Sequence, residues 1–198
     1  MPFAHWLLDD ILPASMIATL SSLPFTPPSV GQFDGRRESN NATRVYFTPA
    51  IQSQFAVSRD LVEVFSHPDV VTGIVDLTGA DLGGARLRIE YCQDTDGFWL
   101  EPHCDIAVKR FTMLIYLSDD PALHDAGTDI YDDTAAHKRV ASVPYRQNAG
   151  LIFIPGDATW HGFSPRPIRG LRTSLIINYV AAEWRATDEL ANPDKPVA

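Results

Sequence analysis

The chain has 198 residues, of which 45% are hydrophobic and 21% are charged, and this composition predicts one globular domain spanning residues 1–198. Its formal net charge is −9 and it has no run of Lys or Arg, which argues against a nucleic acid as its partner. Neither a signal-peptide pattern nor a run of about 18 apolar residues occurs, so we expect a cytoplasmic protein without a membrane partner. The two cysteines, Cys92 and Cys104, have no C-x-x-C partner, so neither a disulfide framework nor a zinc knuckle is expected.

Residues 1–80 are predicted to be largely helical. The segment WLLDDILP predicts a short strand and a turn, and the apolar spacing after Pro13 predicts a helix over ASMIATLSSL. Residues 50–66 predict one continuous helix, because their apolar residues fall on one helical face. Residues 68–78 predict another helix, which stops at Gly79.

Residues 24–44 are rich in Pro, Gly, Ser and Asn, and they predict a loop. Three arginines in this loop, Arg36, Arg37 and Arg44, could face a substrate. The favoured interpretation is a solvated surface loop, because connecting segments usually run over the surface.

The spacing of apolar residues changes from helical to alternating at Ala85. Leu87, Ile89 and Tyr91 alternate with charged residues, which predicts a strand with one apolar face. We expect this face to be the inward one, so that Tyr91 points into a barrel. Further strand-like segments follow between turns: FTMLIYL, GTDIYDD, RVASVPYR, LIFIP and LRTSLIINYV. Many short strands at regular spacing predict an all-β sandwich or barrel.

A candidate metal site is formed by His103, Asp105 and His161. The first two form an H-x-D pair, and residues i and i+2 of a strand point the same way, so both could reach one ion. His161 follows far downstream in GDATWHGF. Two imidazoles and one carboxylate are the protein ligands of the facial triad that holds non-haem Fe(II).

Arg172 is the candidate anion-binding residue. It alternates with Leu171 and Thr173 in LRTSLIINYV, and Ser174 lies on the same face. An arginine between apolar strands is costly to bury unpaired, so Arg172 requires an anion. Two other arginines are less suitable, since Arg166 lies between two prolines and Arg169 lies at a turn.

The order of these motifs resembles the 2-oxoglutarate/Fe(II)-dependent oxygenase superfamily, and within it the prolyl-4-hydroxylase-like branch. The pattern of that branch is similar to Tyr91, QDTDGFWLEP, His103-Cys104-Asp105 and FTMLIYLSDD here. The similarity covers roughly residues 85–182. It implies a mainly β fold with N-terminal helices, a cupin-like double-stranded β-helix or jelly roll. Residues 85–182 would be its core and residues 1–80 its helical support.

The same resemblance implies a function. His103, Asp105 and His161 would bind Fe(II), and the distal carboxylate of 2-oxoglutarate would meet Arg172, with Ser174 and Tyr91 beside it. The reaction would use O2, hydroxylate a small molecule, a sugar or a protein side chain, and release succinate and CO2. Asp105 favours hydroxylation, because a small residue replaces this carboxylate in the halogenases of the superfamily.

The resemblance also implies the orientation of the strand FTMLIYL. Met113 and Ile115 would face the cofactor, and Tyr116 would face the other sheet.

Other polar and aromatic residues are weaker candidates. Phe98 and Trp99 could line the substrate pocket, although simple packing is an equal interpretation. Lys109 could contact substrate or cofactor, although an exposed charge is the favoured interpretation. His124 lies in a polar loop without a partner, so we expect it to be exposed. The tail ANPDKPVA is expected to be frayed.

Three other functions are compatible with parts of this pattern. A non-oxygenase cupin could share the barrel and the metal, but it would not need Arg172 with Ser174. A zinc hydrolase would need a general base near the metal, for which Glu101 is the candidate. A non-catalytic binding module would be expected to lack a member of the triad, and this chain has all three residues. The sequence contains no motif that identifies the substrate or the oligomeric state.

Overall fold

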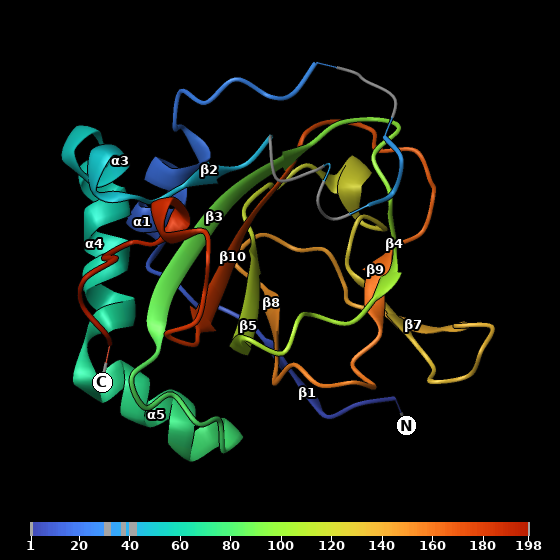
Figure 1. Cartoon of the computed structure of the whole chain (residues 1–198). Coiled ribbons are helices and arrows are strands. Elements are labelled where there is room, and N and C mark those ends of the chain that lie inside the picture. Colours follow the sequence, from blue (N-terminus) through green and yellow to red (C-terminus); the bar gives the residue numbers. More distant parts are fainter. Residues whose placement is uncertain (1, 30–32, 37–38, 40–42, 198) are drawn as a thin grey trace.

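The computed structural model describes residues 2–29, 33–36, 39 and 43–197, and its framework is two antiparallel sheets with helices on one outer side (Figure 1). The larger sheet has the order β1 (His5–Leu8), β8 (Gly150–Phe153), β5 (Lys109–Tyr116), β10 (Arg172–Val180), β3 (Arg86–Asp94) and β2 (Val45–Tyr46). The smaller sheet has the order β4 (Leu100–His103), β9 (His161–Phe163), β6 (Asp129–Tyr131) and β7 (Arg139–Ser142). Short 3-10 helices lie at Pro121–Leu123 (η1) and Thr187–Glu189 (η2).

The helices are α1 (Ala14–Ser21), α3 (Pro49–Gln54), α4 (Ala56–Ser66) and α5 (Pro68–Thr78), and no helix of the described chain is long and apolar enough to cross a membrane. The prediction of one helix over residues 50–66 is wrong. Phe55 has an extended backbone, with φ −127° and ψ 110°, and separates α3 from α4. Its ring packs edge-on against Phe25, with centroids 5.3 Å apart, so packing outweighs helical continuity here.

Helix α5 has the predicted ends. Pro68 occupies its first turn, where the missing N–H costs nothing, and the ring of His67 accepts a hydrogen bond from the Asp69 amide at 3.3 Å. Gly79 ends the helix with φ +73°, a left-handed conformation that glycine adopts without steric strain.

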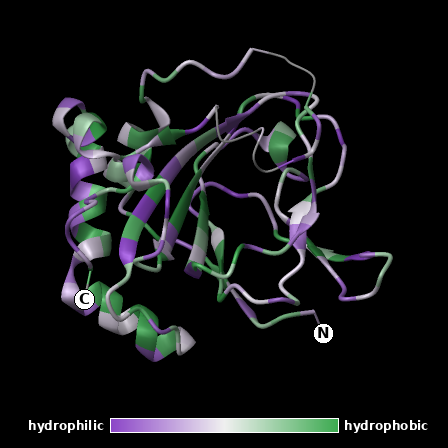
Figure 2. Cartoon of the chain, viewed as in Figure 1, coloured by the Kyte–Doolittle hydropathy of each residue, from purple (hydrophilic) through white to green (hydrophobic). Residues whose placement is uncertain are grey.

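The larger sheet is covered on both faces, and the two coverings differ in polarity. One face packs against the helices through an apolar core that includes Leu87, Ile89 and Tyr91 of β3. The other face looks towards the smaller sheet and carries the polar residues of the same strands. Hydrophilic and hydrophobic bands alternate along β3 in Figure 2.

This arrangement corrects two predicted orientations. Tyr91 points towards the helices rather than into the barrel, and its hydroxyl donates to the carbonyl of Leu20 at 3.1 Å. Met113 and Ile115 also belong to the helix-side core, whereas Tyr116 packs between the sheets. The prediction for Tyr116 is thus confirmed. An apolar set of residues does not identify the inward face when helices cover the outward one.

The C-terminal segment is docked, so the prediction of a frayed tail is wrong. Leu190 and Ala191 are fully buried, and the amide of Ala191 donates to the carbonyl of Leu87 at 2.9 Å. The amide of Val197 donates to the carbonyl of Ala85 at 2.9 Å. These backbone hydrogen bonds therefore hold the C-terminal segment against β3 and the residue before it.

Candidate active site

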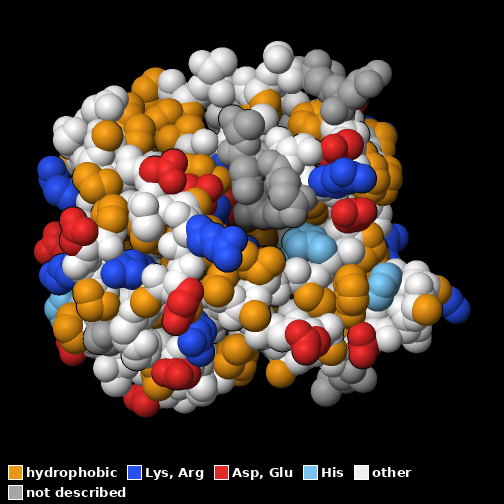
Figure 3. Space-filling view, viewed as in Figure 1, with side chains coloured by type: hydrophobic (Ala, Val, Ile, Leu, Met, Phe, Trp, Pro, Cys, Tyr) orange, Lys and Arg blue, Asp and Glu red, His pale blue; other side chains and the backbone are white. Residues whose placement is uncertain are grey.

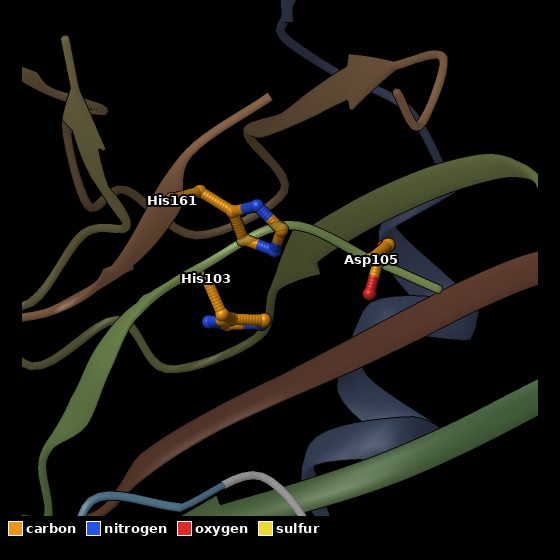
Figure 4. Close-up of side chains that lie close together, drawn as sticks. All are labelled: His103, Asp105 and His161. Atoms are coloured by element: carbon orange, nitrogen blue, oxygen red, sulfur yellow. The ribbon is translucent and has the colours of Figure 1, made fainter. Parts of the chain in front are cut away.

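The residues of the predicted triad come together between the two sheets. His103 ends β4 and His161 begins β9, and the two are direct partners in the antiparallel pairing of these strands. Asp105 follows His103 by two residues. One ligand atom from each of the three side chains lies within 4.8 Å of the others, and Figure 4 shows the three side chains around one shared space.

Both histidines are held so that one ring nitrogen faces away from the backbone. Nδ1 of His103 lies 2.9 Å from the Glu101 carbonyl, and Nδ1 of His161 lies 2.8 Å from the Thr159 carbonyl. A carbonyl oxygen can only accept, so each Nδ1 carries the hydrogen. In the neutral ring Nε2 then has a lone pair for a metal, and a carbonyl that orients a histidine ligand in this way is typical of metal sites. The donor set therefore fits a divalent transition metal.

Asp105 is kept ionised by its surroundings. Lys109 Nζ donates to Oδ1 at 2.6 Å, and Thr112 Oγ1 donates to Oδ2 at 2.7 Å. Burial of this carboxyl raises its pKa, but the positive charge of Lys109, the nearby His161 ring and these hydrogen bonds outweigh burial and hold the pKa well below its usual range. The group is thus a carboxylate, the form that binds a metal. Lys109 is buried in the pocket, so the expectation of an exposed charge is wrong.

A second charged group lines the same pocket. Arg172 is buried and donates from Nη1 to Asp94, its direct cross-strand neighbour on β3, and from Nε to the carbonyl of Ala126 at 2.7 Å. Burial alone would lower the pKa of Arg172, but Asp94 raises it above its ordinary value. The anion that this buried arginine requires is therefore supplied in part by Asp94 of the chain itself. Ser174 lies on the same face and also lines the pocket.

Sequence reasoning missed the cluster around Asp94. Arg44 donates from Nη1 to Asp94 Oδ1 at 2.7 Å, so one carboxylate holds two guanidinium groups. Arg44 was expected in a solvated loop, but its side chain is 3% exposed and lines the pocket. The sequence did contain a signal for this cluster. In both β3 and β10 polar residues alternate with apolar ones, so pairing of the two strands can bring their polar residues together on one face.

The remaining candidates are distributed as follows. Phe98 lines the pocket, whereas the indole of Trp99 donates to the carbonyl of Phe33 at 3.0 Å. His124 is exposed, as predicted, and so is Arg36. Arg37 lies outside the described residues.

The pocket as a whole joins the triad to the arginine cluster. The inward residues of β5 and β10 lie between the two, and the pocket is lined by Arg44, Cys92, Asp94, Phe98, Leu100, His103, Asp105, Lys109, Thr112, Leu114, Thr128, His161, Gly162, Phe163, Arg172, Ser174 and Ile176. Among the side chains coloured in Figure 3, basic and acidic groups are interspersed over the surface shown. The cationic groups of the pocket are instead internal, because the side chains of Arg44, Lys109 and Arg172 are only 3–7% exposed.

Known proteins were compared at the levels of sequence and structure. No family model matches the sequence, and a search of curated proteins finds no match. Solved structures do match: a Pseudomonas putida prolyl-4-hydroxylase has a TM-score of 0.60 and 13% identity, over 89% of this chain and 92% of that chain. HygX from Streptomyces hygroscopicus, with nickel, 2-oxoglutarate and hygromycin B bound, has a TM-score of 0.59 and 14% identity, over 91% and 85%.

A third similar structure is a prolyl hydroxylase from Trichoplax adhaerens in complex with a hypoxia inducible factor peptide fragment. Its TM-score is 0.58 with 14% identity, over 89% of this chain and 83% of that chain. These likenesses confirm the predicted fold: the chain has a double-stranded β-helix, as these three similar structures do.

Proposed function

We propose that this protein is an Fe(II)- and 2-oxoglutarate-dependent dioxygenase that hydroxylates its substrate. The observation that carries the proposal is one pocket with two chemically different groups of residues. One group is the ligand set His103, Asp105 and His161, and the other includes the buried Arg172 with Ser174. A metal with an open position and a dicarboxylate that reaches from it to an arginine would use both groups.

The chain's own residues would have separate roles. His103 and His161 would present Nε2 to the metal, and Asp105 would present a carboxylate oxygen. Arg172 would bind the distal carboxylate of 2-oxoglutarate, because its Nη2 makes no hydrogen bond among the described residues, and Ser174 could add a hydroxyl donor. Fe(II), 2-oxoglutarate and O2 would supply the oxidation, with release of succinate and CO2.

The substrate is proposed to be a small molecule, a sugar or a protein side chain. The similar structures support this range, since one holds a peptide fragment and another holds hygromycin B. Both cysteines are free thiols in the structure, which supports the proposal that the protein acts in the reducing cytoplasm.

A zinc hydrolase is less well supported. Its candidate general base, Glu101, has an exposed side chain and does not line the pocket. A non-oxygenase cupin would use the triad, but it gives no reason for an arginine pair and Ser174 in the same pocket. The oxygenase alone uses both ends of the pocket.

Anaerobic titration of Fe(II) and then 2-oxoglutarate tests the proposal. We expect a metal-to-ligand absorption band, and succinate release in air with a panel of peptides, sugars and amino acids. His103→Ala or His161→Ala should abolish Fe(II) binding, since each removes one of the three protein ligands. His124→Ala is the matched control, because this exposed histidine lies away from the pocket. Full Fe(II) affinity in either triad variant would contradict the assignment.

A further inference from the structure

A row of buried polar residues crosses the larger sheet and ends on the triad carboxylate. Thr112 of β5 donates to Asp105 Oδ2 at 2.7 Å, and its hydroxyl oxygen accepts from Asn178 Nδ2 at 2.9 Å. Asn178 Oδ1 in turn accepts from Arg88 Nη1 at 3.2 Å. The row therefore links Asp105 to a buried arginine on β3.

The strand register explains why these residues meet. Asn178 of the central strand β10 is the direct partner of Thr112 on β5 and of Arg88 on β3. Direct cross-strand partners on one face have side chains within contact distance. All three are buried, with 0–2% of each residue exposed. At the far end Arg88 Nε donates to Glu189 Oε2 at 2.6 Å, so the row also reaches the C-terminal segment.

Between Arg88 and Asp105, every hydrogen bond of the row is donated towards the carboxylate. Arg88 can only donate, so Asn178 turns its carbonyl oxygen to Arg88 and its amide hydrogens to Thr112. The Thr112 oxygen is then an acceptor, which leaves its own hydrogen for Asp105. Hydrogen bonds in such a chain polarise one another and strengthen the last bond. The carboxylate thus meets a donor whose orientation is fixed from β3, two strands away from β5.

Strand pairing alone does not require these polar groups. In the next row of the same face, Ile176 of β10 is the partner of Leu114 on β5. Two apolar residues fill the places that correspond to Asn178 and Thr112. A buried polar group costs free energy unless it is hydrogen-bonded, so the polar row calls for a specific explanation.

We propose that Thr112, Asn178 and Arg88 are positioning residues that fix the Asp105 carboxylate for metal binding. The proposal rests on the metal-binding role of Asp105 in the proposed function. With Thr112 holding Oδ2 and Lys109 holding Oδ1, the carboxylate cannot turn freely, so its orientation relative to the two histidines is fixed. Outer hydrogen-bond partners of this kind orient metal ligands and tune metal affinity.

The first test is the affinity for Fe(II) under anaerobic conditions, or for Co(II) as a stable probe, measured by calorimetry. Thr112→Val removes the donor at nearly constant volume and should weaken metal binding by about 10–100-fold, as outer-partner substitutions commonly do. Thr112→Ser keeps the hydroxyl and should restore the affinity to within about threefold of the wild type. Thr173→Val is the matched control, because this buried threonine lies on the opposite face of β10 and should not affect metal affinity.

The second test asks whether Asn178 acts through Thr112. Asn178→Leu should weaken metal binding less than Thr112→Val, and it should have no further effect in the Thr112→Val background. The d–d absorption of bound Co(II), which reports ligand geometry, should change in both single variants and stay unchanged in Thr173→Val. Equal metal affinity in wild type and Thr112→Val, or additive effects of the two substitutions, would overturn the proposal.

These outcomes are separate from failure of the proposed function. If wild type binds no Fe(II) or Co(II), the metal site itself is wrong, and the positioning role falls with it. If wild type binds metal and Thr112→Val binds it equally well, only the positioning role is wrong. Circular dichroism and thermal unfolding of the metal-free variants separate loss of positioning from loss of fold.

Discussion

Three aspartates with buried side chains, Asp94, Asp105 and Asp129, are each surrounded by several donors. Asp94 accepts from two arginines, and Asp105 accepts from Lys109 and Thr112. Asp129 accepts from Arg166 at 2.6 Å and from a backbone amide at 2.8 Å. Because an ionised group in a protein interior is costly unless paired, these donors determine whether the polar interior is stable.

The first prediction at this scale concerns Arg172. Arg172→Ala should weaken 2-oxoglutarate binding by at least about tenfold, since loss of one partner from a buried charge pair typically costs about 2–5 kcal/mol. Fe(II) affinity should stay nearly unchanged. Titration of 2-oxoglutarate into the Fe(II) form, followed by the metal-to-ligand absorption band, measures the effect.

Arg169→Ala is the control for this measurement. Its side chain is exposed in the turn before β10, so its loss should change 2-oxoglutarate affinity by less than about threefold. If Arg169→Ala proved the more harmful substitution, the cosubstrate site would have to be moved towards that turn.

The second prediction concerns Asp129 and acid stability. Burial raises the pKa of this carboxyl, but Arg166 and hydrogen bonds from Ser142 and Ser164 lower it further, so the folded pKa lies below the ordinary value. The ion pair therefore contributes stability above the unfolded pKa of about 3.9, and this stability is lost as pH falls towards the folded pKa. Asp129→Asn should unfold more easily near neutral pH and should lose less of its free energy of unfolding than wild type on acidification.

Urea unfolding at about pH 6 and about pH 3 compares the two proteins. Asp125→Asn is the control, because the Asp125 side chain is exposed. An equal loss of stability on acidification in wild type and Asp129→Asn would show that the pair contributes nothing to acid sensitivity.

At the scale of strands and helices, the distance between β4 and β9 is set by Gly162. A Cβ added to this glycine would lie 2.7 Å from the Leu100 carbonyl oxygen and 2.8 Å from that of Glu101. The Glu101 carbonyl also orients His103, and Gly162 directly follows His161. The close approach of these strands therefore holds the two histidines in their relative positions.

Gly162→Ala should separate β4 from β9. We expect a loss of about 1–3 kcal/mol in the free energy of unfolding, as for other substitutions that overfill a packed site, together with weaker metal binding. Gly73→Ala is the contrasting variant, since nothing lies within 4 Å of an added Cβ in the middle of α5. It should stabilise the protein by about 0.5–1 kcal/mol and leave metal binding unchanged. Unaltered metal affinity in Gly162→Ala would show that the site tolerates strand movement.

The strands also show how far the sequence could predict the site. The H-x-D pair, His161 and Arg172 could be identified because their residue types and order are unusual and β10 alternates clearly. The orientation of β3 was predicted wrongly because the apolar set of a strand was assumed to face inward. In this sheet the outward face packs against helices and is the more apolar, so Tyr91 lies outside the pocket. A shift of one residue in a strand exchanges its faces, and a single strand contains no signal that identifies the covered side.

The ends of the helices could likewise be predicted only in part. The ends of α5 follow from Pro68 and Gly79, whose backbone preferences are local. The break at Phe55 depends on its contact with Phe25, which comes from a distant part of the chain. The cluster of Arg44, Asp94 and Arg172 likewise depends on contacts across the fold, and Arg44 comes from a segment that reads as a loop.

At the scale of the whole molecule, the C-terminal segment links the helices, the larger sheet and the polar row. A chain that ends after Glu183 should lose about 3–5 kcal/mol in the free energy of unfolding, because it exposes the sites of Leu190, Ala191 and Val197. Urea unfolding measures the loss. Asp194→Ala, which changes an exposed residue of the same segment, should have little effect. Equal stability of the shortened chain would mean that this segment only covers the surface.

The place of β10 in the larger sheet has a consequence for how the protein is made. It is the last strand of the described chain, yet it pairs with both β3 and β5 over most of its length (Figure 1). While the ribosome extends the chain from its N-terminus, β3 and β5 must therefore remain without the strand that joins them until residues 172–180 have been translated. Their unpaired edges are exposed during that time, and exposed edges favour pairing with other chains. Synthesis rate and chaperone access over residues 110–180 should consequently affect the yield of folded protein more than changes earlier in the chain.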